Sequence, residues 1–216
     1  MEKIKNIKKA LAMMLIISEG LCAPAVNTTA ELLKVANEIN VKTEGFVVSG
    51  WIKAGSRQNI KLLERLLGAE LKAGNNLLKI GSDELKIVIS DSKKPSISLQ
   101  LITQSELTAE YYRSFWQKYA DSWGSGEIIG ITVLAQAYEE MSGLEQKKII
   151  AQAAEILHGQ GQVHQSSDGM EGVFFSPKLG KGLTVAEEEL NFNMVIRNRE
   201  NRCDIYLAAP LIYQTY

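Results

Sequence analysis

The chain contains few of the side chains on which most catalytic and metal sites are built. Among its 216 residues there are two histidines and two cysteines, and 24 Lys and Arg nearly balance 25 Asp and Glu. This balance gives the protein no general attraction to the phosphate backbone of nucleic acids. Gly180 and Gly182 also lack the third glycine and the following helix of a dinucleotide-binding motif. We therefore expect no cofactor.

The two histidines do not predict a metal site or a catalytic centre. His158 and His164 lie six residues apart with no third metal ligand between them. His164 and the Ser-Ser-Asp run at 166–168 are the residue types of a catalytic triad, but one short loop cannot orient them in series. The run Glu187–Glu189 is predicted to be a solvated strand edge, because an acid and base pair needs one desolvated carboxyl. We expect no catalytic residue.

The N-terminus has the pattern of a cleaved signal peptide over residues 1–25. A basic start is followed by the apolar run Ala10–Ser18 and by Ala23-Pro24-Ala25, an A-x-A cleavage site. As a helix, nine residues reach only ~13 Å, whereas the hydrocarbon core of a membrane is ~30 Å thick. We expect export, cleavage after Ala25 and contact with the membrane only during export. The alternative is a soluble amphipathic first helix.

Cleavage after Ala25 would leave Cys203 as the only cysteine of residues 26–216, so no intramolecular disulfide could form. Cys203 alternates with Ile205 and Leu207, which predicts a buried position in a strand. The mature chain, residues 26–216, is expected to be a single globular domain that its apolar core holds together.

The stretch Glu127–His158 predicts a central strand followed by an amphipathic helix. Its apolar residues from Ile128 onward do not simply alternate, which is typical of a strand covered on both faces. Ser142 and Glu145 have the spacing of a capping box at the start of the helix. Gly159 is the predicted left-handed residue that ends it.

A weaker copy of this unit lies about 85 residues earlier, so we predict an α+β fold of two tandem pseudo-repeats, 28–104 and 105–216. Each repeat is a helix, a strand, a second helix and a run of antiparallel strands, in one continuous sheet or two abutting sheets. In the first repeat we expect helices over 28–40 and 58–67, and strands over 45–55, 77–80, 85–90 and 96–103. In the second we expect a helix from the Thr103 and Glu106 caps to Trp123, the central strand and helix, and strands near 162–165, 172–176, 190–197, 202–208 and from Leu211.

The helix that opens the second repeat carries six aromatic residues. Tyr111, Phe115, Tyr119 and Trp123 recur every four residues and form one face. Tyr112 and Trp116 lie beside that face. If either remained exposed, it would mark a binding patch for a peptide, a glycan or a partner protein, so these two are the candidate binding residues.

The chain resembles the YwmB family of uncharacterised exported proteins from spore-forming Gram-positive bacteria. The residues that carry the resemblance are Gly50-Trp51, Leu67-Gly68, the Ser142–Gly159 helix and the ending Ala209–Tyr216. The resemblance implies an α+β fold of two related halves, similar in outline to the saddle of TATA-box-binding proteins. A shared fold does not by itself imply a shared function.

A saddle that bends DNA needs apolar wedges and a basic concave face. Phe174-Phe175 is a wedge candidate, but one of two adjacent strand residues is expected to face the core. Arg197, Arg199 and Arg202 form a local basic cluster, which is typical of a solvated turn. DNA binding is therefore the alternative to our preferred interpretation.

We expect an exported, non-enzymatic binding or assembly module at the cell envelope. Its partner would be an envelope protein, a peptide or a glycan. A nucleic-acid-binding saddle and a cell-wall-directed hydrolase are the two alternatives.

Overall fold

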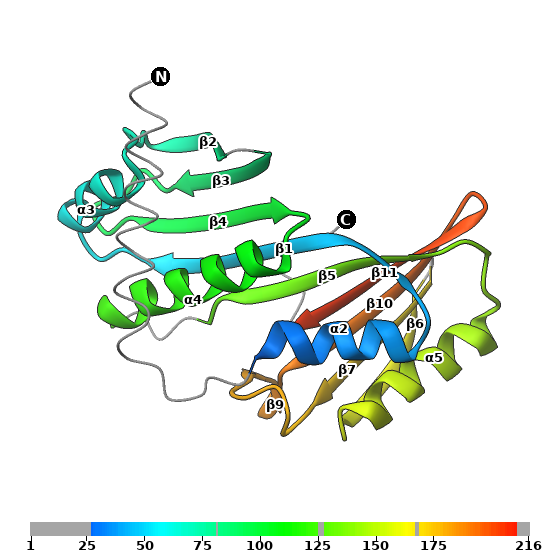
Figure 1. Ribbon diagram of the computed structural model, residues 1–216. Helices are drawn as coiled ribbons and strands as arrows, with labels where there is room; N and C mark the ends of the chain where they lie inside the picture. Colours follow the sequence, from blue (N-terminus) through cyan, green and yellow to red (C-terminus); the bar gives the residue numbers. More distant parts are fainter. Residues whose placement is uncertain (1–26, 81, 125–127, 167–168, 211–216) are drawn as a thin grey trace.

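The protein is an α+β structure built on one large antiparallel sheet (Figure 1). The computed structural model describes residues 27–80, 82–124, 128–166 and 169–210. The predicted signal peptide and the strand expected from Leu211 lie outside the described residues. Within the described ranges, no helix is long and apolar enough to cross a membrane.

The helices and strands follow one another in the order that the sequence predicts, with one added hairpin. The helices are α2 (Thr28–Glu38), α3 (Arg57–Leu67), α4 (Glu106–Ser122) and α5 (Gly143–Ile156). The strands of the first half are β1 (Lys42–Lys53), β2 (Gly74–Ile80), β3 (Asp83–Ile89) and β4 (Ser96–Thr103). Those of the second half are β5 (Gly130–Ala137), β6 (Gln160–Ser166), β7 (Gly169–Phe175), β10 (Phe192–Arg199) and β11 (Arg202–Ala209).

The nine strands form one continuous sheet in the order β2-β3-β4-β1-β5-β11-β10-β7-β6, and all neighbours are antiparallel. The two halves meet where β1 pairs with β5, with Phe46 opposite Val133. This pairing decides between the two arrangements that the sequence left open, since the halves share one sheet. The sheet is not closed, and β2 and β6 are its two edges.

One face of the sheet carries the hydrophobic core and the helices. In β4 the inward residues Ile97, Leu99 and Leu101 are buried and alternate with more exposed neighbours, as expected for a strand covered on one face. Helix α4 packs on β1, β4 and β5, α2 packs on β5 and β11, and α5 packs on β7 and β6. In Figure 1 these three helices lie side by side in front of the sheet, with α3 at its left end. No helix of the described residues packs on the opposite side, which we call the helix-free face.

Two of the predicted helix starts are shifted, and one is confirmed. The side chain of Asn27, not that of Thr28, accepts the capping hydrogen bond of α2, from the N–H of Ala30. Ser105, not Thr103, caps α4. Both bonds of the Ser142 and Glu145 capping box are present. A capping side chain must lie just outside the helix, and the buried Thr28 is its first residue.

The end of α5 differs by one residue from the prediction. His158, at φ 53°, is the left-handed residue, and its N–H and that of Gly159 donate to the carbonyls of Glu155 and Ala154. Gly159 is needed instead for close packing, because a Cβ there would lie 3.3 Å from the Cβ of Phe174. The left-handed Gly68 that ends α3 is as predicted.

The sequence analysis missed a small hairpin between β7 and β10. Its strands are β8 (Leu183–Val185) and β9 (Glu188–Leu190), and the turn residues Ala186 and Glu187 both have positive φ. Neither residue is a glycine or an asparagine, so the usual signal for such a turn is missing. Glu187, Glu188 and Glu189 are all exposed, which confirms the solvated strand edge.

Candidate binding cleft

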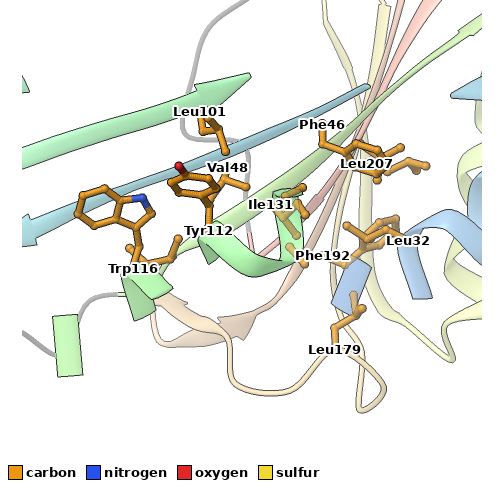
Figure 2. Packing of buried hydrophobic residues seen from close by; sticks show 14 of the residues in the cluster. Leu32, Phe46, Val48, Leu101, Tyr112, Trp116, Ile131, Leu179, Phe192 and Leu207 are labelled. Atoms are coloured by element: carbon orange, nitrogen blue, oxygen red, sulfur yellow. The ribbon is translucent and has the colours of Figure 1, made fainter. Parts of the chain in front are cut away.

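The aromatic helix α4 does not provide the exposed patch that was considered for it. Trp116 is 0% exposed and Tyr112 is 5% exposed, and Figure 2 shows both in the cluster that also holds Val48 and Leu101. Burial also raises the pKa of Tyr112. Neither side chain meets the condition for a binding patch, so this expectation is corrected.

The reason is that α4 buries a different face from the predicted one. Tyr112, Trp116 and Tyr119 point inward, whereas Tyr111 and Phe115 are only partly buried. A regular repeat of four residues slips around a helix that has 3.6 residues per turn. Tyr112, Trp116 and Tyr119, at spacings of four and three, stay on one stripe and cover β1 and β4.

The two histidines lie on different elements, and residues 167–168 of the run considered with His164 lie outside the described residues. His164 lies on the exposed edge strand β6, and His158 lies at the end of α5. The thiol of Cys203 is buried and donates to Oδ1 of Asn198, and burial is the main cause of its raised pKa, which disfavours the thiolate that a nucleophile needs. The described part of the chain holds no group of three His, Cys, Asp or Glu side chains that could bind a metal ion.

Among the described residues, a concave surface lies where β1 begins, β5 ends and α5 begins. This cleft has a volume of about 680 Å³. That volume is within the usual range of ligand sites, roughly 300–1,000 Å³. Its lining residues come from three separate parts of the chain: Asn40, Val41, Lys42, Gln136, Ala137, Tyr138, Glu139, Glu140, Met141, Glu145, Lys148 and Ile149.

The cleft has an apolar floor and a charged rim. Val41, Ala137, Met141 and Ile149 are buried or partly buried. On the rim, the ring of Tyr138 is 71% exposed. The rim also carries three carboxylates and two ammonium groups, contributed by Glu139, Glu140, Glu145, Lys42 and Lys148.

Lys42 is already engaged within the protein. Its ammonium group lies 2.7 Å from the carboxylate of Glu44 and 5.9 Å from the centroid of the Tyr138 ring. The hydrogen bond to Glu44 is the main cause of its raised pKa, followed by the contact with Tyr138. The charge of Lys42 is therefore partly offset, which leaves the rim with an excess of negative charge.

Glu145 is held in its ionised form by the helix start. Its carboxylate accepts hydrogen bonds from the N–H of Ser142, at 2.8 Å, and from the hydroxyl of Ser142, at 2.6 Å. These bonds lower the pKa of Glu145. The same capping box that begins α5 thus presents a fixed negative charge to the cleft.

The loop beneath the cleft is fixed by the tip of the β10–β11 hairpin. The side-chain amide of Asn198 donates to the carbonyl of Met141, at 2.9 Å, and accepts from its N–H. Gln146, which is buried, donates both to the carbonyl of Met141 and to Oδ1 of Asn198. No local sequence signal predicts this network, because Asn198 and Met141 are 57 residues apart.

The helix-free face is a second candidate surface, but its character is mixed. Trp51 and Ile102 are exposed there, while Val47, between β4 and β5, is only 1% exposed. The exposed apolar side chains are separated by polar ones such as Ser98, which lies opposite Trp51. Single exposed apolar side chains are normal on protein surfaces and do not define a site.

Two features that would suit DNA, an apolar wedge and a basic cluster, can be followed among the described residues. Phe174 is buried in the core, as expected, and stacks on Phe192, so it is no wedge. Arg199 and Arg202 both lie within 3.4 Å of the carboxylate of Asp204. Arg199 and Arg202 thus lie at the solvated turn that the sequence indicated, with their charge partly neutralised, whereas Arg197 lies within β10 and is only partly exposed.

The fold defines the class of protein as α+β with an open antiparallel sheet covered by helices on one face. No family model matches the chain, and no curated protein is significantly similar to it. The resemblance to the YwmB family therefore stays a prediction from the sequence.

Proposed function

We propose that this protein is an exported, non-enzymatic binding or assembly module at the cell envelope, and that its cleft holds a peptide segment of an envelope protein. The observation that carries the proposal is the cleft at the start of α5, with its apolar floor, its exposed Tyr138 and its negative rim. Export rests on the signal-peptide pattern of residues 1–25.

The charges of the rim favour a basic segment as the occupant. Glu139, Glu140 and Glu145 face Lys148 and a Lys42 that Glu44 already binds. A peptide with a Lys or Arg near an apolar side chain would place its charge on the rim and its apolar group on the floor. The ring of Tyr138 can hold a cation or an aliphatic stem.

Catalysis is less well supported than binding at this site. An acid and base pair needs carboxyls in different environments, one of them desolvated so that its pKa rises. Glu139 and Glu140 are both exposed, and the pKa of Glu145 is lowered. A wall-directed hydrolase would need one desolvated carboxyl beside an ionised one, and the lining residues of the cleft do not provide this pair.

We also infer that the two halves are related repeats in a saddle-like arrangement. In each half a helix precedes a central strand, a second helix follows it, and antiparallel strands complete the sheet. The central strands β1 and β5 are paired with each other, and each half extends outward from that pair. A nucleic-acid role for such a saddle is the alternative, and export would separate the protein from the chromosome.

Site-specific photo-crosslinking in cells tests the proposed function. A photoreactive amino acid in place of Tyr138 should form a crosslink to an envelope protein. The matched control is the same amino acid in place of Leu107, which is 84% exposed on α4. A second variant, Glu139→Lys with Glu140→Lys, should lower the crosslink yield from position 138, because it reverses the charge of the rim. Equal crosslinks from positions 138 and 107, or a yield that the charge reversal does not change, would contradict the proposal.

A further inference from the structure

Among the described strands, the sheet ends at one edge in β6, whose sequence lacks the charged and proline residues that usually protect an edge against pairing. Strand β6 has the sequence Gln-Gly-Gln-Val-His-Gln-Ser, and all of its residues except Val163 are exposed. It contains no Lys, Arg, Asp, Glu or Pro. Proteins normally protect an exposed edge with such residues, because its unpaired N–H and C=O groups can bind another strand.

The opposite edge, β2, is partly protected. The side-chain amide of Asn76 donates to the carbonyl of Lys72 and accepts from its N–H, so the preceding loop is fixed beside β2. Lys79 adds a charge to this strand. The two edges therefore differ, since of the two described edge strands β6 alone has no charged residue.

We propose that β6 pairs with β6 of a second copy of this chain, in antiparallel orientation, about a two-fold axis that passes Val163. In this register Gln162 lies opposite His164 of the second copy, and Gly161 lies opposite Gln165. Neither pair opposes like charges, so the strand is compatible with itself. Isologous two-fold contacts are the commonest way in which identical chains associate.

The helix above this edge has charges that fit the same axis. A Cβ on Gly172 would lie 2.5 Å from Cγ2 of Ile150, and Gly172 is paired with Val163. The axis therefore passes α5 close to Ile150. Symmetry about Ile150 places Lys147 level with Ala153 of the second copy and within one helical turn of its Glu155, and both charged residues are exposed.

The geometry leaves room for the two copies of α5 to lie side by side. The side of α5 that faces α2 is fixed, because Gln152 donates to the carbonyl of Glu38 at the end of α2. The other side of α5 is nearer the β6 edge, and it carries Lys147 and the small Ala151. With strands about 4.8 Å apart, the two helices above β6 and β7 would be roughly 10–14 Å apart, within reach of Lys147 and Glu155.

The expected association is weak, and the proposed partner is a second copy of this chain. A contact of seven residues with one helix flank lies at the low end of protein interfaces, so we expect dissociation in the micromolar range. A foreign strand could also bind the edge, but the match between Lys147 and Glu155 favours a second copy. The pairing would join two helix-free faces into one surface.

Sedimentation of charge variants of the full chain tests the proposal. The double variant Gln162→Lys with His164→Lys places two lysines opposite each other twice across the axis, and should weaken the dimer about tenfold or more. The matched variant Gln162→Lys with His164→Glu places opposite charges there, and should dimerise at least as well as the parent protein. Both positions are exposed, but His164 lies opposite Glu171 on β7, so each variant must first show the same urea midpoint as the parent protein.

A crosslink tests the register itself. In a Cys22→Ser background, Val163→Cys should form an intermolecular disulfide, because directly opposite Cα atoms are about 4.5–5.5 Å apart. The same substitution on the other edge, Leu77→Cys, should not. A parent protein that stays monomeric at about 100 µM would overturn the proposal. So would a dimer in which the two charge variants behave alike and Val163→Cys gives no crosslink.

Discussion

The Asn198→Ala substitution should loosen the cleft and lower stability by about 1–2 kcal/mol. The amide of Asn198 makes two hydrogen bonds to the main chain of Met141 and accepts one from Gln146 and one from Cys203. A net hydrogen bond contributes roughly 1 kcal/mol, and the exposure of Asn198 lets water replace part of what is lost. The buried Gln146 keeps its bond to the carbonyl of Met141.

A double-mutant cycle of Asn198→Ala and Gln146→Ala measures the coupling free energy between these two side chains. Urea unfolding of the two single variants and of the double variant should give a coupling free energy of about 0.5–1.5 kcal/mol, since the side chains are bonded to each other. Glu200→Ala, at the same hairpin tip, is the control and should change stability by less than about 0.5 kcal/mol. Additive effects of the two substitutions would refute the idea that the hairpin tip holds the start of α5.

Three further predictions concern packing, capping and the aromatic helix. Gly172→Ala should destabilise the fold by about 1–3 kcal/mol, because its Cβ would lie 2.5 Å from Ile150; Gly143→Ala, whose nearest atom would be 3.9 Å away, should change little, and equal urea midpoints would contradict this packing. Ser142→Ala should lower stability at pH 7. Because the pKa of Glu145 is lowered in the folded state, its contribution is present above the unfolded pKa, and the Ser142→Ala difference should shrink as the pH falls below about 4; a difference that stays constant down to pH 2 would argue against the capping box. Acrylamide should quench Trp51, which is 40% exposed, more strongly than Trp116, which is 0% exposed, so Trp51→Phe should remove more of the quenchable fluorescence than Trp116→Phe does; the reverse order would contradict the burial of α4.

The parts of the fold that depend on neighbouring residues could be predicted from the sequence. The Ser142 and Glu145 capping box and the left-handed Gly68 need only residues close in the chain, and both are present. The alternation in β3 and β4 likewise gave their inward residues correctly. Such features have local causes, so a single sequence is enough.

The parts that depend on distant contacts could not be predicted. Nothing near His158 in the sequence indicates that it, and not Gly159, is left-handed, and the packing of Gly159 against Phe174 is a contact between residues distant in the sequence. The cleft could not be predicted either, because its lining comes from three separate parts of the chain, residues 40–42, 136–141 and 145–149. No pattern in the sequence indicated that Tyr138 would be exposed. The aromatic pattern of the helix instead pointed to Tyr112 and Trp116, which are buried.

The intact mass of the native protein, measured after cell fractionation, tests the central claim most directly. We expect a mature chain that begins at Val26 and is found outside the cytoplasmic membrane. That result would place the cleft among envelope proteins and remove the chromosome as a partner. A full-length chain in the cytoplasm would contradict export, and with it the proposed envelope function.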